Sequence, residues 1–184
     1  MRGVWRAIAI FIAGGVLGTG FGVALGFFLF PFVFPPPPAN EQLTAADIAP
    51  LAATPAPAAP SSASAPATPV AAATGTFIHA NPSDPVHWGR GKVSAFERTI
   101  FLEADFEVGP GPKYHVYLVP KANVRREADV ANAMYVDLGR LRAFKGSQRY
   151  PVPDGVDVKK YASVVIWCER FGVLISPADM MAAK

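Results

Sequence analysis

The most constraining feature of the sequence is a long stretch without charged side chains near its N-terminus. No Asp, Glu, Lys or Arg occurs from Ala7 to Asn40, and the 24 residues from Ala7 to Phe30 are almost all apolar. A helix of that length spans roughly 36 Å, which is enough to cross the hydrocarbon core of a membrane. The stretch therefore predicts a transmembrane helix within residues 1–34.

The flanks of this stretch predict that the helix is a retained signal anchor. A cleaved signal peptide is the alternative, but its apolar region is usually only about 7–15 residues long. Arg2 and Arg6 precede the stretch, and the next Lys or Arg is Arg90. The positive-inside rule then places the N-terminus in the cytoplasm and the rest of the chain in the periplasm or outside the cell.

Four glycines recur at intervals of four residues within the expected span: Gly14, Gly18, Gly22 and Gly26. Glycines at this spacing form a groove on one face of a helix, where a second backbone can approach closely. We expect this face to associate with a second copy of the chain or with a partner helix in the membrane. The alternative is that glycine is simply frequent in membrane helices.

Residues 35–74 have the composition of a disordered linker, with 10 Pro and 15 Ala among 40 residues. Proline favours the extended polyproline II conformation, so a fully extended linker of this length would reach on the order of 120 Å. Few large apolar side chains follow Phe34, so the segment has little with which to build a core. The sequence predicts a spacer between the membrane helix and a folded domain.

Residues 75–184 have the composition of one small globular domain and show the period-two pattern of β-strands. Glycine, proline and other turn-forming residues separate the expected strands. Short strands with such breaks predict an all-β fold, an antiparallel sandwich or a barrel-like domain. Two single helical turns are also expected, within 125–132 and 157–161. The expected strands are 76–79, 92–97, 99–106, 114–119, 134–138, 148–152, 162–168 and 171–175.

Charge and motif content exclude several functional classes. The chain has a net charge of +3, and the charges of residues 75–184 are scattered and mixed in sign. No basic stripe indicates a nucleic-acid partner. The sequence contains no GxSxG, HExxH or phosphate-binding glycine motif, and no His spacing typical of a metal site. We therefore predict neither an enzyme nor a metal centre.

Cys168 is the single cysteine, so it has no partner for an intramolecular disulfide. Its parity with Val164 and Ile166 places it on an apolar strand face. It is a buried, inert thiol, an intermolecular crosslink, or a functional thiol or ligand. His115 and Tyr117 share one face of an expected strand, and His87 lies in a loop before Trp88.

Several segments of the domain together resemble the DM-thirteen domain, which also occurs in Skeletor proteins and is described as an electron-transfer domain. The resemblance implies that Cys168 is the redox residue, as a bare thiol or as a ligand of a haem-type group. It also matches His87 and the strand with His115 and Tyr117 to family positions, whereas Lys113 stands where the family commonly has Asp. The segments that carry it are GTF, HWGRG, ADF, GPKYHVYL, DLGRLRAFKGSQRYPVP and YASVVIWCERFGVLISPADM.

Two functions follow as expectations. The first is a membrane-anchored redox or electron-transfer module that acts through Cys168, with His115, His87 and Tyr117 as candidate cofactor-binding residues. The second is a binding or structural module at the cell envelope in which Cys168 is only packed. The surroundings of the Cys168 sulfur distinguish them, because a reactive thiol needs exposure or a lowered pKa.

Overall fold

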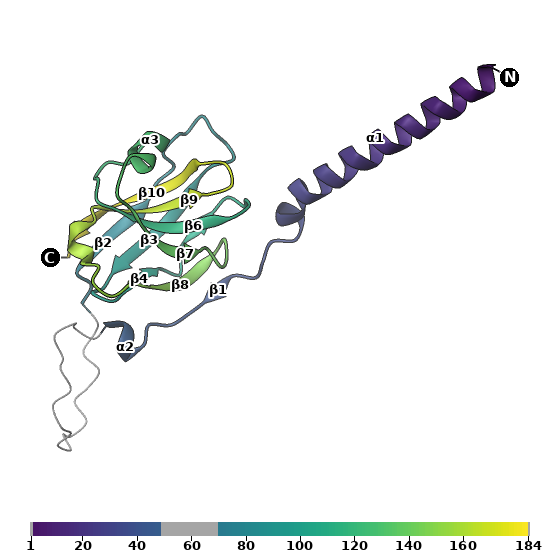
Figure 1. Ribbon diagram of the computed structural model, residues 1–184. Coiled ribbons are helices and arrows are strands. Elements are labelled where there is room, and N and C mark those ends of the chain that lie inside the picture. The colour runs from purple at the N-terminus through teal and green to yellow at the C-terminus, as the bar shows by residue number, and fades with distance from the viewer. Residues whose placement is uncertain (1, 49–69, 184) are drawn as a thin grey trace. The chain divides into compact units, whose positions relative to one another are not determined.

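The computed structural model describes residues 2–48 and 70–183, and the chain divides into two compact units after Pro36. The first unit is one helix, α1 (Arg2–Val33), with Pro31 in its last turn. The second unit begins at Pro37 and contains all the β-strands (Figure 1). The expected linker residues 49–69 lie outside the described residues.

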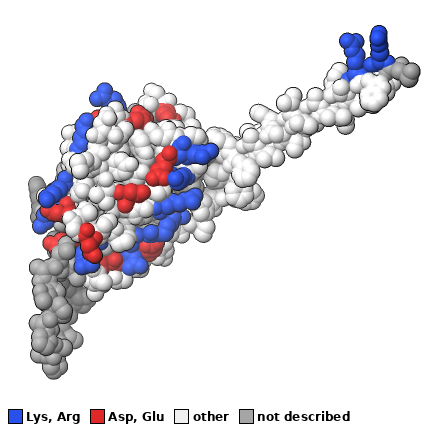
Figure 2. Space-filling view, in the orientation of Figure 1, with Lys and Arg blue, Asp and Glu red and all other residues white. Residues whose placement is uncertain are grey.

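Helix α1 is apolar on all sides after its first two turns. It has the length and hydropathy required to cross a membrane, and a signal sequence at an N-terminus would have the same properties. Figure 2 shows the basic side chains at its N-terminal end, where the sequence has Arg2 and Arg6, and uncharged residues along the rest of the visible face. Open space lies where a Cβ would project from Gly14, Gly18, Gly22 and Gly26. Their role in helix association stays a prediction.

The second unit is one strongly curled sheet that forms a half-barrel (Figure 1). The strand order is β1-β8-β4-β3-β2-β10-β9-β6-β7, with β5 paired to β3, and every pair except β1–β8 is antiparallel. The all-β prediction is confirmed, in the form of a single curled sheet. The strands are β1 (Ala39–Asn40), β2 (Ala73–Phe77), β3 (Gly89–Ala95), β4 (Thr99–Leu102), β5 (Glu107–Val108), β6 (Tyr114–Val119), β7 (Val136–Arg140), β8 (Gly146–Pro151), β9 (Ser163–Cys168) and β10 (Val173–Ala182).

Alternating apolar side chains from these strands fill the inside of the curled sheet. On β9, for example, Val164 and Ile166 are fully buried and belong to the main core. Gln148 is the largest of several fully buried polar side chains, and its amide is satisfied. Its oxygen accepts hydrogen bonds from the backbone N–H of Arg142 and Ala143 and from the Tyr150 hydroxyl. Buried polar groups need such partners, so Gln148 fixes the chain before β8 against β8 itself.

A second, smaller apolar cluster covers the opposite face of β6 and β9. It contains Tyr117, Val165, Trp167 and Leu174 together with Val130 of the short helix α3 (Glu127–Ala131). Every residue of β9 is therefore buried, because both faces of the strand are covered. Burial on both faces explains why this strand reads as a nearly continuous apolar run rather than as an alternating one.

Every expected strand overlaps an observed one, although β1 and β5 were not expected. Two expected strands end at clearly different residues, for physical reasons. Strand β4 ends at Leu102 instead of continuing to Phe106, because the chain turns at 104–105 and enters β5. Strand β10 runs to Ala182, beyond the expected end at Ile175, because it pairs with β9 on one side and with β2 on the other. The two expected helical turns are α3 and the 3-10 turn at Val158–Lys160.

Residues 37–48, which the sequence assigned to the disordered linker, fold onto the domain instead, and we call them the strap. Strand β1 of the strap pairs with β8 in parallel, with Ala39 opposite Gly146. Gly146 has a φ of +87°, and a Cβ on it would lie 2.1 Å from the Ala39 carbonyl oxygen. A glycine is therefore required for this close approach. The strap covers the edge of β8, which would otherwise leave backbone groups unpaired.

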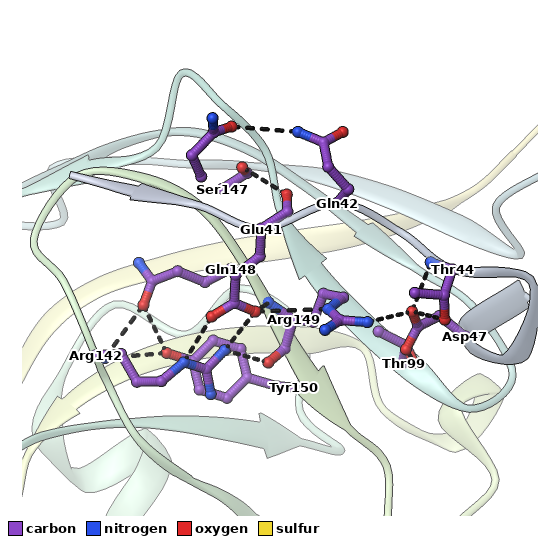
Figure 3. Close-up of polar contacts among 11 residues, drawn as sticks. Glu41, Gln42, Thr44, Asp47, Thr99, Arg142, Ser147, Gln148, Arg149 and Tyr150 are labelled. Carbon is purple, nitrogen blue, oxygen red and sulfur yellow. Dashed lines mark hydrogen bonds and ion pairs between the residues drawn. The ribbon is translucent and has the colours of Figure 1, made fainter.

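Charged side chains hold the strap in place (Figure 3). Both oxygens of Glu41 accept hydrogen bonds of 2.9 Å from the Arg142 guanidinium. Asp47 accepts hydrogen bonds from Thr44, from Arg149 at 2.8 Å and from Thr99 at 3.2 Å. We call Glu41, Asp47, Arg142 and Arg149 the strap cluster. Its two carboxylates and two guanidiniums balance in charge.

Candidate functional site

The candidate residues lie on the paired strands β6 and β9, on two opposite faces. Tyr114 is opposite Cys168, and His115 is opposite Trp167. Because side chains alternate along a strand, Tyr114 and Cys168 point into the main core, whereas His115, Tyr117 and Trp167 point to the other face. The structure therefore brings His115 and Tyr117 together and separates both of them from Cys168.

The Cys168 side chain is packed in the core, with 1 % of its surface exposed. Its thiol donates a hydrogen bond to the Pro112 carbonyl oxygen at 3.2 Å. Tyr114, its partner across the strand pair, is buried as well, and burial raises the pKa of this phenol far above its ordinary value. A thiol in this position is shielded from reagents in solution.

The surroundings of Cys168 do not fit a haem-type group. Such a group needs open space at the ligating sulfur, whereas this sulfur lies inside a closely packed core. His115 cannot supply the second axial ligand, because it points to the opposite face of the sheet. His87 lies in the loop between β2 and β3, where its Nδ1 pairs with Asp84 Oδ2 at 2.6 Å. This interaction, with help from backbone N–H groups, holds the pKa of Asp84 at about 2.

The face opposite Cys168 carries a compact group of ionisable side chains, His115, Asp137, Glu169 and Lys113, which we call the His115 cluster. His115 Nδ1 lies 2.9 Å from Asp137 Oδ2, and His115 Nε2 lies 3.4 Å from Glu169 Oε2. The Lys113 ammonium lies 2.7 Å from the same Glu169 oxygen. The His115 and Glu169 side chains are 14 % and 24 % exposed, so the cluster is half-buried but open to solvent.

Local backbone geometry places these groups together. Strand β7 pairs with β6 through an irregular register between His115 and Tyr117, which brings Asp137 beside both residues. The backbone N–H of Gly139 donates to Asp137 Oδ1 at 2.7 Å and fixes that carboxylate. Glu169 follows β9 directly, and its N–H donates to the carbonyl of Lys113 at 3.2 Å.

Hydrogen bonds and charges shift the ionisation of the His115 cluster. The Lys113 ammonium, the Tyr117 hydroxyl and His115 together hold the pKa of Glu169 below its ordinary value. Burial and the hydrogen bond that the Tyr117 hydroxyl donates to Glu169 at 3.0 Å raise the pKa of Tyr117 well above its ordinary value. Glu169 is therefore a firmly ionised carboxylate that a neutral phenol orients.

Three aromatic rings lie directly beside this cluster. Tyr117 stacks on Tyr135 with ring centroids 4.3 Å apart, and it lies nearly parallel to Trp167 at 6.4 Å. Trp167 and Cys168 are neighbours on β9, so their side chains lie on opposite faces of the strand. The row of rings therefore begins one residue away from the sulfur, on the other face. Tyr135 is 45 % exposed, and the row of rings therefore runs from the strand pair to the surface.

Sequence reasoning found His115, Tyr117 and Cys168 but missed Asp137, Glu169 and the ring of Tyr135. The cluster draws on β6, β7 and the turn after β9, with no short spacing that would reveal it. The one available signal was Lys113, which departs from the family pattern and in the structure contacts Glu169.

A comparison with protein-family models finds one match, the model described as electron transfer DM13, over residues 82–180. No curated protein and no solved structure matches the chain. The matched segment includes β3 to β9, most of β10 and every residue of the His115 cluster. It covers more than half of the chain, which therefore belongs to the DM13 electron-transfer family.

Proposed function

We propose that this protein is a membrane-anchored electron-transfer module, with its β domain outside the cytoplasm and the Cys168 thiol as its redox group. Membership of the DM13 family supports electron transfer as the function. The 32-residue apolar helix α1 and the arginines at its start support the anchor and its orientation. We assign no catalysed reaction to it.

The proposal that Cys168 is the redox group rests on its position beside a row of aromatic rings. A thiol with 1 % exposure cannot exchange disulfides readily with bulky partners, so its electrons must pass through the protein. The adjacent Trp167, with Tyr117 and Tyr135, forms a row of rings between the strand of Cys168 and the surface. We infer that a one-electron partner docks near Tyr135 and that no haem participates.

The burial of Cys168 favours a second candidate function. A sulfur inside an apolar core, with its hydrogen bond to Pro112, has the surroundings of a residue that serves packing alone. The domain would then be a binding module displayed at the envelope.

A redox titration separates the two functions. The full chain in detergent is titrated anaerobically with ferricyanide, which gains one electron when the thiol loses one electron and releases its proton to water. We expect the protein to consume one equivalent through Cys168 and the Cys168→Ser variant to consume none. The Trp167→Phe variant is expected to react at least tenfold more slowly, whereas Tyr150→Phe, a buried tyrosine on β8, serves as the matched control and reacts at the original rate. Equal consumption by the protein and by Cys168→Ser would establish the binding module instead.

A further inference from the structure

We propose that His115, Asp137 and Glu169 form a binding site for a divalent transition-metal ion on the face of the sheet opposite Cys168. One ligand atom from each of the three side chains lies within 4.8 Å of the others. The site does not depend on Cys168, so it stands or falls separately from the proposed electron transfer.

The three side chains supply a suitable set of donors. An imidazole with two carboxylates suits first-row divalent ions such as Zn²⁺, Mn²⁺ and Fe²⁺. Ligands bound about 2.1 Å from an ion lie roughly 3 Å to 4 Å apart, and His115 Nε2 and Glu169 Oε2 are already 3.4 Å apart. Side-chain adjustments of less than about 1 Å would bring all three donors into range.

The groups around the donors have the character of an outer shell. The Tyr117 hydroxyl holds Glu169 Oε1 at 3.0 Å, and the Gly139 N–H holds Asp137 Oδ1 at 2.7 Å. Such second-layer hydrogen bonds orient ligands and are typical of metal sites. Each carboxylate is thus fixed through one oxygen, while its other oxygen faces His115.

The Lys113 ammonium contacts one of the oxygens that we propose as a metal ligand. It lies 2.7 Å from Glu169 Oε2, but the Lys113 side chain is 56 % exposed and can move into solvent. With Lys113 displaced, the ligand atoms of two carboxylates and one imidazole, one from each side chain, lie within 4.8 Å of one another. We infer that Lys113 and the metal ion compete for Glu169, so that Lys113 sets the affinity of the site.

A calorimetric titration of the full chain in detergent with Zn²⁺ tests this proposal. We expect one Zn²⁺ per chain, and a loss of affinity of at least tenfold in both His115→Gln and Glu169→Gln. Lys113→Met is expected to bind Zn²⁺ about tenfold more tightly, because the competing cation is gone. A gain in affinity cannot arise from misfolding, so this variant keeps the test decisive.

Two control variants complete the experiment. His87→Gln removes the other histidine that is paired with a carboxylate, and we expect unchanged Zn²⁺ binding. Cys168→Ser is also expected to bind Zn²⁺ normally, which separates this site from the redox proposal. Zn²⁺ affinity that is unaltered in His115→Gln, or that does not rise in Lys113→Met, would overturn the inference.

Discussion

The strap cluster and the His115 cluster each contain two carboxylates with cations nearby, but they differ in how those carboxylates are satisfied. Glu41 and Asp47 face two guanidiniums, and hydrogen-bond donors occupy every carboxylate oxygen. Asp137 and Glu169 share one exposed ammonium, that of Lys113, and one histidine, His115. The first arrangement holds the strap on the domain, whereas the second is where we propose that a metal ion binds.

Removing Arg149 is expected to have the largest effect on stability. Its guanidinium donates to Asp47 at 2.8 Å and also lies beside Glu41, so Arg149→Met leaves two half-buried carboxylates short of a partner. We expect a clear fall in the free energy of unfolding in urea, because both carboxylates keep their charge with fewer donors. The matched control, Arg140→Met on the exposed side of β7, should stay within about 0.5 kcal/mol. Equal effects of the two variants would show that the strap cluster contributes no more than ordinary surface charge.

Acidification is expected to release the strap, with an effect of about 2 kcal/mol. Burial opposes ionisation of Asp47, but hydrogen bonds from Thr44, Arg149 and Thr99 outweigh it and hold the pKa at about 2. Because this pKa is lower in the folded state than the usual value near 4, the stabilisation is present above about pH 4 and is lost as the pH falls to 2. The NMR signals of the Ala39 and Glu41 amides, which bond to β8 and its preceding loop, report the release. Asp47→Asn should remove this transition, and a transition that persists in the variant would contradict the assignment.

Replacing Lys113 is expected to have the smallest effect. Its side chain is more than half exposed, so the metal-free Lys113→Met variant should lose less than about 1 kcal/mol of unfolding free energy. The pKa of Glu169 should rise towards its ordinary value, because Lys113 makes the largest contribution to lowering it. Chemical denaturation and an NMR titration of Glu169 measure the two changes. Lys145→Met, which removes the ammonium beside Glu107, is the matched control. A loss of several kcal/mol in Lys113→Met alone would make the His115 cluster structural, like the strap cluster.

The sequence predicted the strands of the β domain well where their apolar side chains all face one core. Residues 114–119 were expected as a strand and are β6, and the run that ends at Cys168 is β9. The pattern also placed Cys168 correctly on an apolar face, where it is buried. Periodicity reports on burial, and burial determined these features.

The strap and the His115 cluster were beyond this reasoning because both depend on distant contacts. Polyproline II and β-strand backbones have similar dihedral angles, so Pro37 and Pro38 suit a free linker and a docked strand equally well. Only the position of Arg142 and Arg149, about 100 residues later in the chain, decides between them. Likewise, Asp137 and Glu169 resemble solvated carboxylates until strand pairing brings them to His115.

The docked strap also changes how far the domain can travel. A spacer of forty residues would let the domain search a volume more than 100 Å deep, but only residues 34–38 connect Val33 of α1 to Ala39 of β1. An extended chain covers at most about 3.6 Å per residue, so this connection can reach no further than roughly 20 Å. The reach of the domain from α1 is then set by these few residues, and adding residues between 48 and 70, which both belong to the second unit, would not extend it.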